Sequence, residues 1–113
     1  MKIRITENFI RIRISPNDAE ALFQFNELKL SVCMGPESNL QWKLLLIASQ
    51  DAQMELQNQL CLISIPKDPV RIWLKNQSEK IVFALADTQI SLEKDYPCDH
   101  QEANPANTFA RPQ

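Results

Sequence analysis

Four cationic side chains lie within the first thirteen residues, although the whole chain of 113 residues carries a formal net charge of −2. They alternate with isoleucines, and they are Lys2, Arg4, Arg11 and Arg13. Guanidinium groups bind carboxylates and phosphates through paired hydrogen bonds. This spacing therefore indicates either an anion-binding surface or a charge network with carboxylates from elsewhere in the chain.

The last apolar segment of the chain supplies the matching carboxylates. Glu93 and Asp95 alternate with apolar residues, so they share one face of a predicted strand. We expect them to hold the three arginines, with Glu55 as a further candidate. Paired carboxylates also serve acid–base catalysis, but charge networks place them together as readily, and we predict no catalytic residue. The alternative is that the cations bind a small anion or phosphate, as a binding module or a phosphoester enzyme.

The cysteines and the single histidine do not form a metal motif. A structural zinc site usually takes four closely spaced Cys or His ligands, whereas Cys98 and His100 stand apart from Cys33 and Cys61. The single glycine rules out phosphate loops and dinucleotide fingerprints, so no cofactor is predicted. Three widely spaced cysteines make no disulfide framework. We therefore expect free thiols in the cytoplasm, with Cys98 the most reactive.

Alternation of apolar and polar residues predicts that the cations stand on a β-hairpin. A two-residue turn at Glu7–Asn8 sets Ile5 opposite Ile10 on one face. The same register sets Arg4 opposite Arg11 on the other face, where like charges repel by about 0.2–1 kcal/mol per pair. The hairpin therefore requires compensating anions, from the protein or from a ligand.

The rest of the chain repeats this plan. A helix is expected from Pro16, with Ser15 as its N-cap, to about Phe25, and a second over about 69–76. Three more hairpins follow the alternation, the last turning at Asp87–Thr88. The order predicts an α+β fold: an antiparallel sheet or partly closed barrel of about eight strands, with two short helices on one face.

The two halves also align with each other. An offset of fifty pairs Ile12 with Leu62 and Pro16 with Pro66, which indicates an internal repeat of two ββαββ halves. We expect a single domain over 1–95 and an extended tail over 96–113. The predicted core consists of Ile3, Ile5, Ile10, Ile12, Leu22, Phe23, Leu30, Val32, Trp42, Leu44, Leu62, Trp73, Phe83, Leu85 and Leu92.

The two ends of the chain resemble an uncharacterised family of short bacterial proteins, a domain of unknown function. The segments MKIRI, IRIRIS and LEKDYPC carry the resemblance. The family's most recognisable positions correspond to Lys2, Arg4, Arg11, Arg13, Glu93, Lys94, Asp95, Tyr96 and Cys98. The chain departs from the family at the first turn, which has Glu7 and Asn8 where a glycine is expected. Because the family has no known activity, the resemblance implies no substrate, cofactor or partner.

Composition limits the classes of function. The longest strongly apolar run, Leu44 to Ala48, is too short to cross a membrane. The negative net charge disfavours nucleic acid as a partner. We therefore expect a small non-catalytic binding or interaction domain, whose partner is another protein or a second copy of the chain. A module for a small anion is the alternative.

Overall fold

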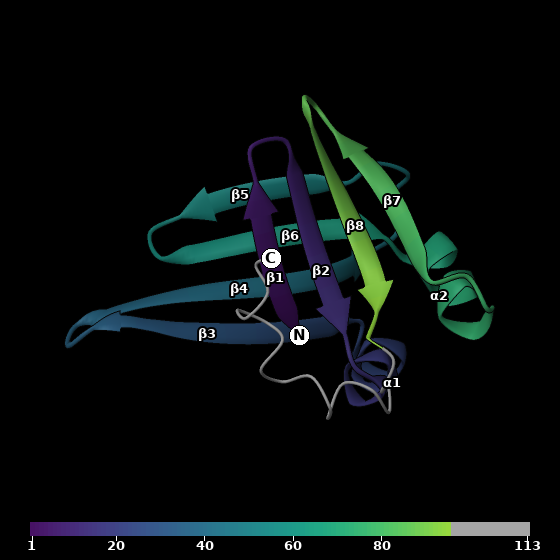
Figure 1. Ribbon diagram of the computed structural model, residues 1–113, viewed down its shortest axis with the longest axis horizontal. Coiled ribbons are helices and arrows are strands. Elements are labelled where there is room, and N and C mark those ends of the chain that lie inside the picture. Colours follow the sequence, from purple (N-terminus) through teal and green to yellow (C-terminus); the bar gives the residue numbers. More distant parts are fainter. Residues whose placement is uncertain (96–113) are drawn as a thin grey trace, which may run out of the picture.

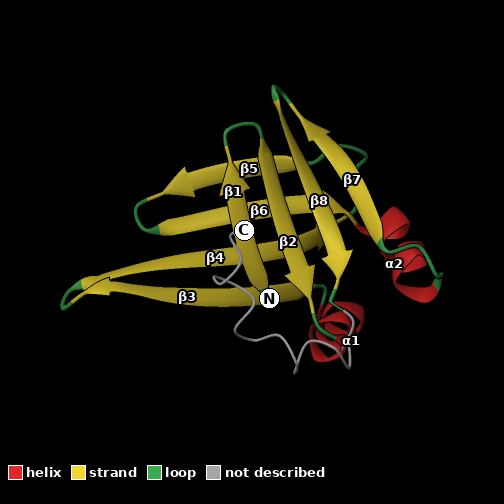
Figure 2. Ribbon diagram, viewed as in Figure 1, coloured by secondary structure: helices red, strands yellow, loops and turns green. Residues whose placement is uncertain are grey.

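The computed structural model describes residues 1–95, which form eight strands and two helices (Figure 2). The strands are β1 (Lys2–Thr6), β2 (Phe9–Ile14), β3 (Glu27–Gly35), β4 (Ser38–Ile47), β5 (Gln53–Gln57), β6 (Leu60–Pro66), β7 (Lys80–Leu85) and β8 (Thr88–Lys94). The helices are α1 (Pro16–Phe25) and α2 (Lys67–Lys75). The predicted tail over 96–113, with Cys98 and His100, lies outside the described residues.

The strands form two four-stranded sheets that pack face to face. The terminal sheet has the order β1-β2-β8-β7, and the middle sheet has the order β3-β4-β6-β5. In each sheet two antiparallel hairpins meet through a parallel pair, β2 with β8 or β4 with β6. Figure 1 shows the strands of the terminal sheet crossing in front of those of the middle sheet.

This architecture confirms the α+β class and corrects its details. The described strands form two mixed sheets and no closed barrel, instead of one antiparallel sheet. The reason is that each hairpin pairs with a hairpin from the other half of the chain. The chain therefore passes from one sheet to the other through α1 and returns through α2, so the helices connect the layers and do not cover one face.

The first hairpin and the first helix form as predicted. Ile5 pairs with Ile10 and Arg4 with Arg11, in the register set by a two-residue turn. Helix α1 begins after Ser15, whose hydroxyl accepts a hydrogen bond from the backbone N–H of Asp18. The carboxylate of Asp18 accepts one in return from the backbone N–H of Ser15, at 2.9 Å. This reciprocal capping box explains why the helix starts there.

The second helix and the last hairpin differ from the prediction. Helix α2 begins at Lys67, because Pro69 falls in its first turn, where no N–H is needed. The last turn is at residues 86–87, with Ala86 in the left-handed conformation (φ 51°), so Phe83 pairs with Ile90. The predicted turn at Asp87–Thr88 was wrong, because it shifts the pairing of β7 with β8 by two residues. A shift of two keeps every side chain on its own face, so alternation alone does not distinguish the two registers.

A single hydrophobic core lies between the sheets. The buried members of the predicted core are Ile10, Ile12, Leu22, Leu44, Trp73 and Leu92. Those partly buried are Ile3, Phe23, Leu30, Trp42, Phe83 and Leu85. Core residues that the sequence analysis missed are Ile14, Leu28, Leu46, Cys61, Ile63, Ile65, Val70 and Ile90. The face of β6 was therefore misassigned, since Ile63 is buried and Leu62 is only half-buried on the opposite face.

Two predicted core residues are exposed. Ile5 is 56% exposed and Val32 is 36% exposed, although both stand on the faces of their strands that point toward the core. An inward direction therefore does not ensure burial at these two positions.

Neither helix is both long and apolar enough to cross a bilayer, among the residues that the structure describes.

Candidate functional site

The four N-terminal cations stand together on the outer face of the terminal sheet. Lys2 and Arg4 come from β1, and Arg11 and Arg13 come from β2. We call this surface, with Glu93, the basic face. The isoleucines that alternate with the cations face inward, where Ile10 and Ile12 are buried, so strand alternation forces the charges onto the opposite side.

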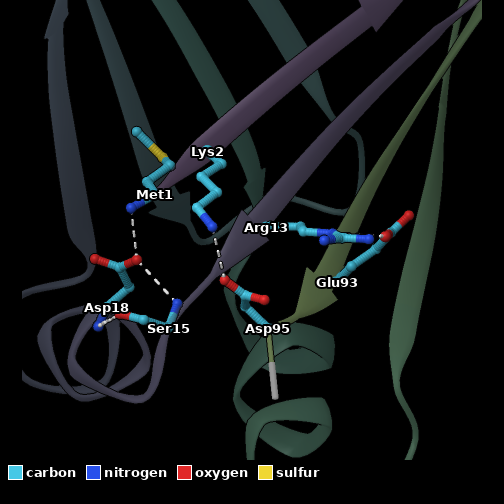
Figure 3. Close-up of polar contacts among 7 residues, drawn as sticks. All are labelled: Met1, Lys2, Arg13, Ser15, Asp18, Glu93 and Asp95. Carbon is cyan, nitrogen blue, oxygen red and sulfur yellow. Dashed lines mark hydrogen bonds and ion pairs between the residues drawn. The ribbon is translucent and has the colours of Figure 1, made fainter. Parts of the chain in front are cut away.

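Glu93 is the central anion of the basic face. Arg11 Nε donates to Glu93 Oε2 at 2.9 Å, and Ser91 Oγ donates to the same oxygen at 3.1 Å. Arg13 Nε lies 3.8 Å from Oε1, and Figure 3 shows the two side chains meeting. Burial raises the pKa of Glu93, but the hydrogen bonds from Arg11 and Ser91 and the positive charges of both arginines outweigh burial and lower it. Glu93 is therefore held in its ionised form.

The other cations of the basic face are less firmly held. Lys2 Nζ lies 3.4 Å from Asp95 Oδ2 (Figure 3), but the lysine side chain is 75% exposed, so the pair is weak. Within residues 1–95 no carboxylate lies at salt-bridge distance from Arg4. Glu55, a candidate partner from the sequence, stands on β5 in the middle sheet and contacts none of the arginines. The expected pairing was therefore wrong for Glu55 and for Arg4, and Asp95 pairs with Lys2 instead of an arginine.

The geometry of the basic face suits charge neutralisation better than catalysis. Two hollows of about 400 and 190 Å³ open on it, and Arg11, Arg13 and Glu93 line both. A general acid or base is most effective when its pKa lies near the working pH. The pKa of Glu93 is displaced in the opposite direction, away from neutrality. The carboxylate is thus suited to organising the arginines and not to exchanging protons.

Two members of this surface were not among the predicted site residues. Ser91 is fully buried and donates to Glu93, and Lys80 lies across the sheet as the register partner of Glu93. Ser91 has the same strand parity as Glu93, so the pattern already placed it on this face. The position of Lys80 depended on the register of the last hairpin, which was predicted two residues out.

A second surface consists of apolar side chains that face inward but remain uncovered. Its four exposed members, which we call the uncovered apolar surface, are Ile5 (56%), Val32 (36%), Met34 (64%) and Leu56 (69%). Along β3 the inward-facing residues change from buried Leu28 through half-buried Leu30 to exposed Val32, and exposed Met34 follows at the register shift between Cys33 and Gly35. Figure 1 shows β3 and β4 continuing past β1, the edge of the terminal sheet. The middle sheet is therefore longer than the layer that covers it.

The cysteines divide by burial. Cys33 is free and exposed, whereas Cys61 is free and buried, and burial raises the pKa of the Cys61 thiol. In the part of the chain that the structure describes, no three His, Cys, Asp or Glu side chains gather as metal ligands do. Cys98, expected to be the most reactive thiol, lies beyond residue 95.

Comparison with known proteins gives one result. A family model described as a family of unknown function (DUF7009) matches residues 1–113. Neither the curated proteins nor the solved structures include a match. The resemblance inferred from the sequence is confirmed at the level of an uncharacterised family.

Proposed function

The chain belongs to DUF7009, a family of unknown function, and from this premise we propose that it is a small non-catalytic domain that binds another protein. The observation that carries the proposal is the uncovered apolar surface. Large apolar patches on a folded domain commonly mark sites of interaction with a partner. Here the patch continues the inward face of the middle sheet, so a partner would extend the existing core.

The free energy available from this surface is substantial. Full burial of one large apolar side chain contributes about 1.5–3 kcal/mol. Met34 and Leu56 are each more than 60% exposed, so a partner that covers both regains much of that contribution. Half-buried Trp42 lies between Leu30 and Cys61 in the cross-strand row that ends at Leu56. It adds an aromatic side chain of the kind enriched at interfaces.

The alternative, a module or phosphoester enzyme for a small anion, is not favoured. Glu93 already contacts Arg11 and Arg13, and Asp95 contacts Lys2. An anion would have to displace a carboxylate that Arg11 and Ser91 both hold by hydrogen bonds. The internal ion pairs therefore compete with such a ligand on this face.

A peptide-display selection tests the protein-binding function. The immobilised chain should enrich peptides, and the double variant Met34→Lys, Leu56→Lys should not, because two charges replace the exposed apolar side chains. The matched control is Ile72→Lys, which is 67% exposed on α2, away from this surface. Circular dichroism checks that all three proteins are folded. Equal enrichment on the double variant, or none on the unaltered chain, would contradict the proposal.

Three further points belong to the proposal. The first is an internal repeat, supported by topology: exchanging β1, β2, β3 and β4 with β5, β6, β7 and β8 turns the strand order of one sheet into that of the other. An offset of fifty-one then pairs buried Ile12 with buried Ile63, and Leu22 with Trp73.

The second is a cytoplasmic location, which suits the free thiols. The third is the bacterial source suggested by the terminal motifs.

A further inference from the structure

The outer edge of β1 is open among the described strands. Ile14 O accepts from Asp95 N at 2.8 Å, so even-numbered residues of β2 direct their backbone groups toward β8. The odd-numbered residues of β2 therefore bond to β1, which makes Arg4 and Arg11 a hydrogen-bonded pair. In consequence, Ile3 and Ile5 direct their N–H and C=O groups away from β2, to the open edge.

This edge adjoins the uncovered apolar surface. On the side of β1 away from β2, strands β3 and β4 continue beneath it (Figure 1). An open strand edge is a template for an added strand, and pockets or surfaces beside it select the side chains of that strand. A strand added here would extend the terminal sheet over the exposed part of the middle sheet.

We propose, building on the protein-binding function above, that the partner contributes an extended segment that adds to β1 and alternates apolar with acidic side chains. Residues opposite Ile3 and Ile5 point inward, toward the uncovered apolar surface. Residues opposite Lys2 and Arg4 point outward, beside one cation that is 75% exposed and one without a carboxylate at salt-bridge distance in residues 1–95. The two faces of β1 thus require apolar and acidic partners in alternation.

The same charges disfavour a second copy of the chain as the occupant. Antiparallel pairing of β1 with its own copy, centred on Arg4, sets Arg4 against Arg4. Centring on Ile3 sets Lys2 against Arg4. Both arrangements place like charges directly opposite each other, which destabilises a strand pair. A heterologous acidic segment has no such conflict.

The test uses the full chain and a capped seven-residue peptide that alternates valine with glutamate, followed by nuclear magnetic resonance and amide hydrogen exchange. We expect binding with slowed exchange of the Ile3 and Ile5 amides. N-methylation of the peptide amides that face β1 should abolish binding, whereas methylation of the opposite edge should not. A peptide with lysine in place of glutamate should not bind.

Charge reversal in the protein supplies the matched pair of variants. Arg4→Glu should lower the affinity for the glutamate peptide by about tenfold and allow the lysine peptide to bind. The reason is that the variant repels glutamate and attracts lysine. Lys29→Glu makes a similar change at a 69% exposed cation on the outer face of β3, in the other sheet, and should leave the affinity within about twofold. Equal weakening by both variants would overturn the local pairing.

The remaining outcomes separate the two proposals. Binding that survives methylation of the β1-facing amides, or that leaves Ile3 and Ile5 exchange unchanged, refutes strand addition while protein binding stands. Display selection of peptides without alternation does the same. Slow exchange of the Ile3 and Ile5 amides without peptide would show that the edge is already occupied, and it would overturn the inference. The occupant would be a second copy if the slow exchange depends on protein concentration, and the chain itself if it does not. Failure of the display selection contradicts the protein-binding function itself.

Discussion

Arg11 and Glu93 join the two ends of the described chain, with Arg11 Nε 2.9 Å from Glu93 Oε2 across 82 positions of sequence. The contact is diagonal, because the parallel register sets Arg11 beside Ser91 and Arg13 beside Glu93. One carboxylate thereby neutralises an arginine on each side of it. The pair links the first hairpin to the last. In residues 1–95 these two hairpins otherwise pair only through the β2–β8 ladder.

Removing the charge of Glu93 should destabilise the fold slightly. Glu93→Gln leaves Arg11 and Arg13 without their shared anion. Because the Arg11 side chain is 41% exposed, the loss should be about 0.5–1 kcal/mol in the free energy of unfolding. Urea denaturation at low salt measures it, and added salt should shrink the difference. Glu20→Gln, an exposed carboxylate on α1, is the control and should change little.

Acid should weaken the fold through two carboxylates. For both Glu93 and Asp18, burial raises the pKa, but hydrogen bonds and neighbouring positive charges together lower it by more. The folded pKa therefore lies below the unfolded one. Such a group stabilises the fold fully above its unfolded pKa, about 3.9–4.3, and the contribution disappears as pH falls through the folded pKa. Denaturation midpoints between pH 6 and about pH 2 should therefore fall less steeply in Glu93→Gln than in the unaltered chain. Parallel curves would contradict this assignment.

The face of β6 can be checked by two neighbouring alanine substitutions. Ile63 is 1% exposed, so Ile63→Ala should cost about 2–5 kcal/mol in the free energy of unfolding through lost contacts and a cavity. Leu62 is half-buried on the outer face, and Leu62→Ala should cost clearly less. Chemical denaturation of both variants decides the matter, and the reverse ranking would show that the face is wrong.

Arg71 should stabilise the junction of the two helices. Its Nη2 donates to Phe23 O at 2.7 Å and to Asn26 Oδ1 at 3.2 Å, and its guanidinium lies 4.5 Å from the centre of the Phe23 ring. Arg71→Ala should reduce the free energy of unfolding by about 1–3 kcal/mol, because it removes charged hydrogen bonds at the end of α1. Arg71→Lys should not restore it, since lysine lacks the planar guanidinium. The control is Lys75→Ala, whose Nζ lies over the same ring without these bonds.

The described thiols should react at different rates in the native protein. Cys33 is exposed, whereas Cys61 is buried and its pKa is raised by burial, so less thiolate is accessible there. Timed alkylation followed by peptide mass spectrometry should show Cys33 modified well before Cys61. Denaturant should remove the difference. Cys98 remains predicted from the sequence as the most reactive thiol.

Local patterns determined the elements and the pairing of the first hairpin. Isoleucine alternation and the two-residue turn set the register of β1 with β2, and Ser15 with Pro16 set the start of α1. These features depend on neighbours a few positions apart, which a sequence displays directly. The same alternation is enough to place Arg11 and Glu93 on the outer faces of their strands.

Tertiary structure decided what those faces meet. The alignment of the proposed repeat pairs Ile12 with Leu62, but the buried residue in β6 is Ile63, and a slip of one residue exchanges the faces of a strand. That slip is why Leu62 was predicted inside and Ile63 was missed. Ile5 and Val32 have apolar positions typical of a core, yet they are exposed because the two sheets overlap only in part. Alternation defines two faces for every strand, but how far one layer covers another depends on contacts between residues distant in the sequence.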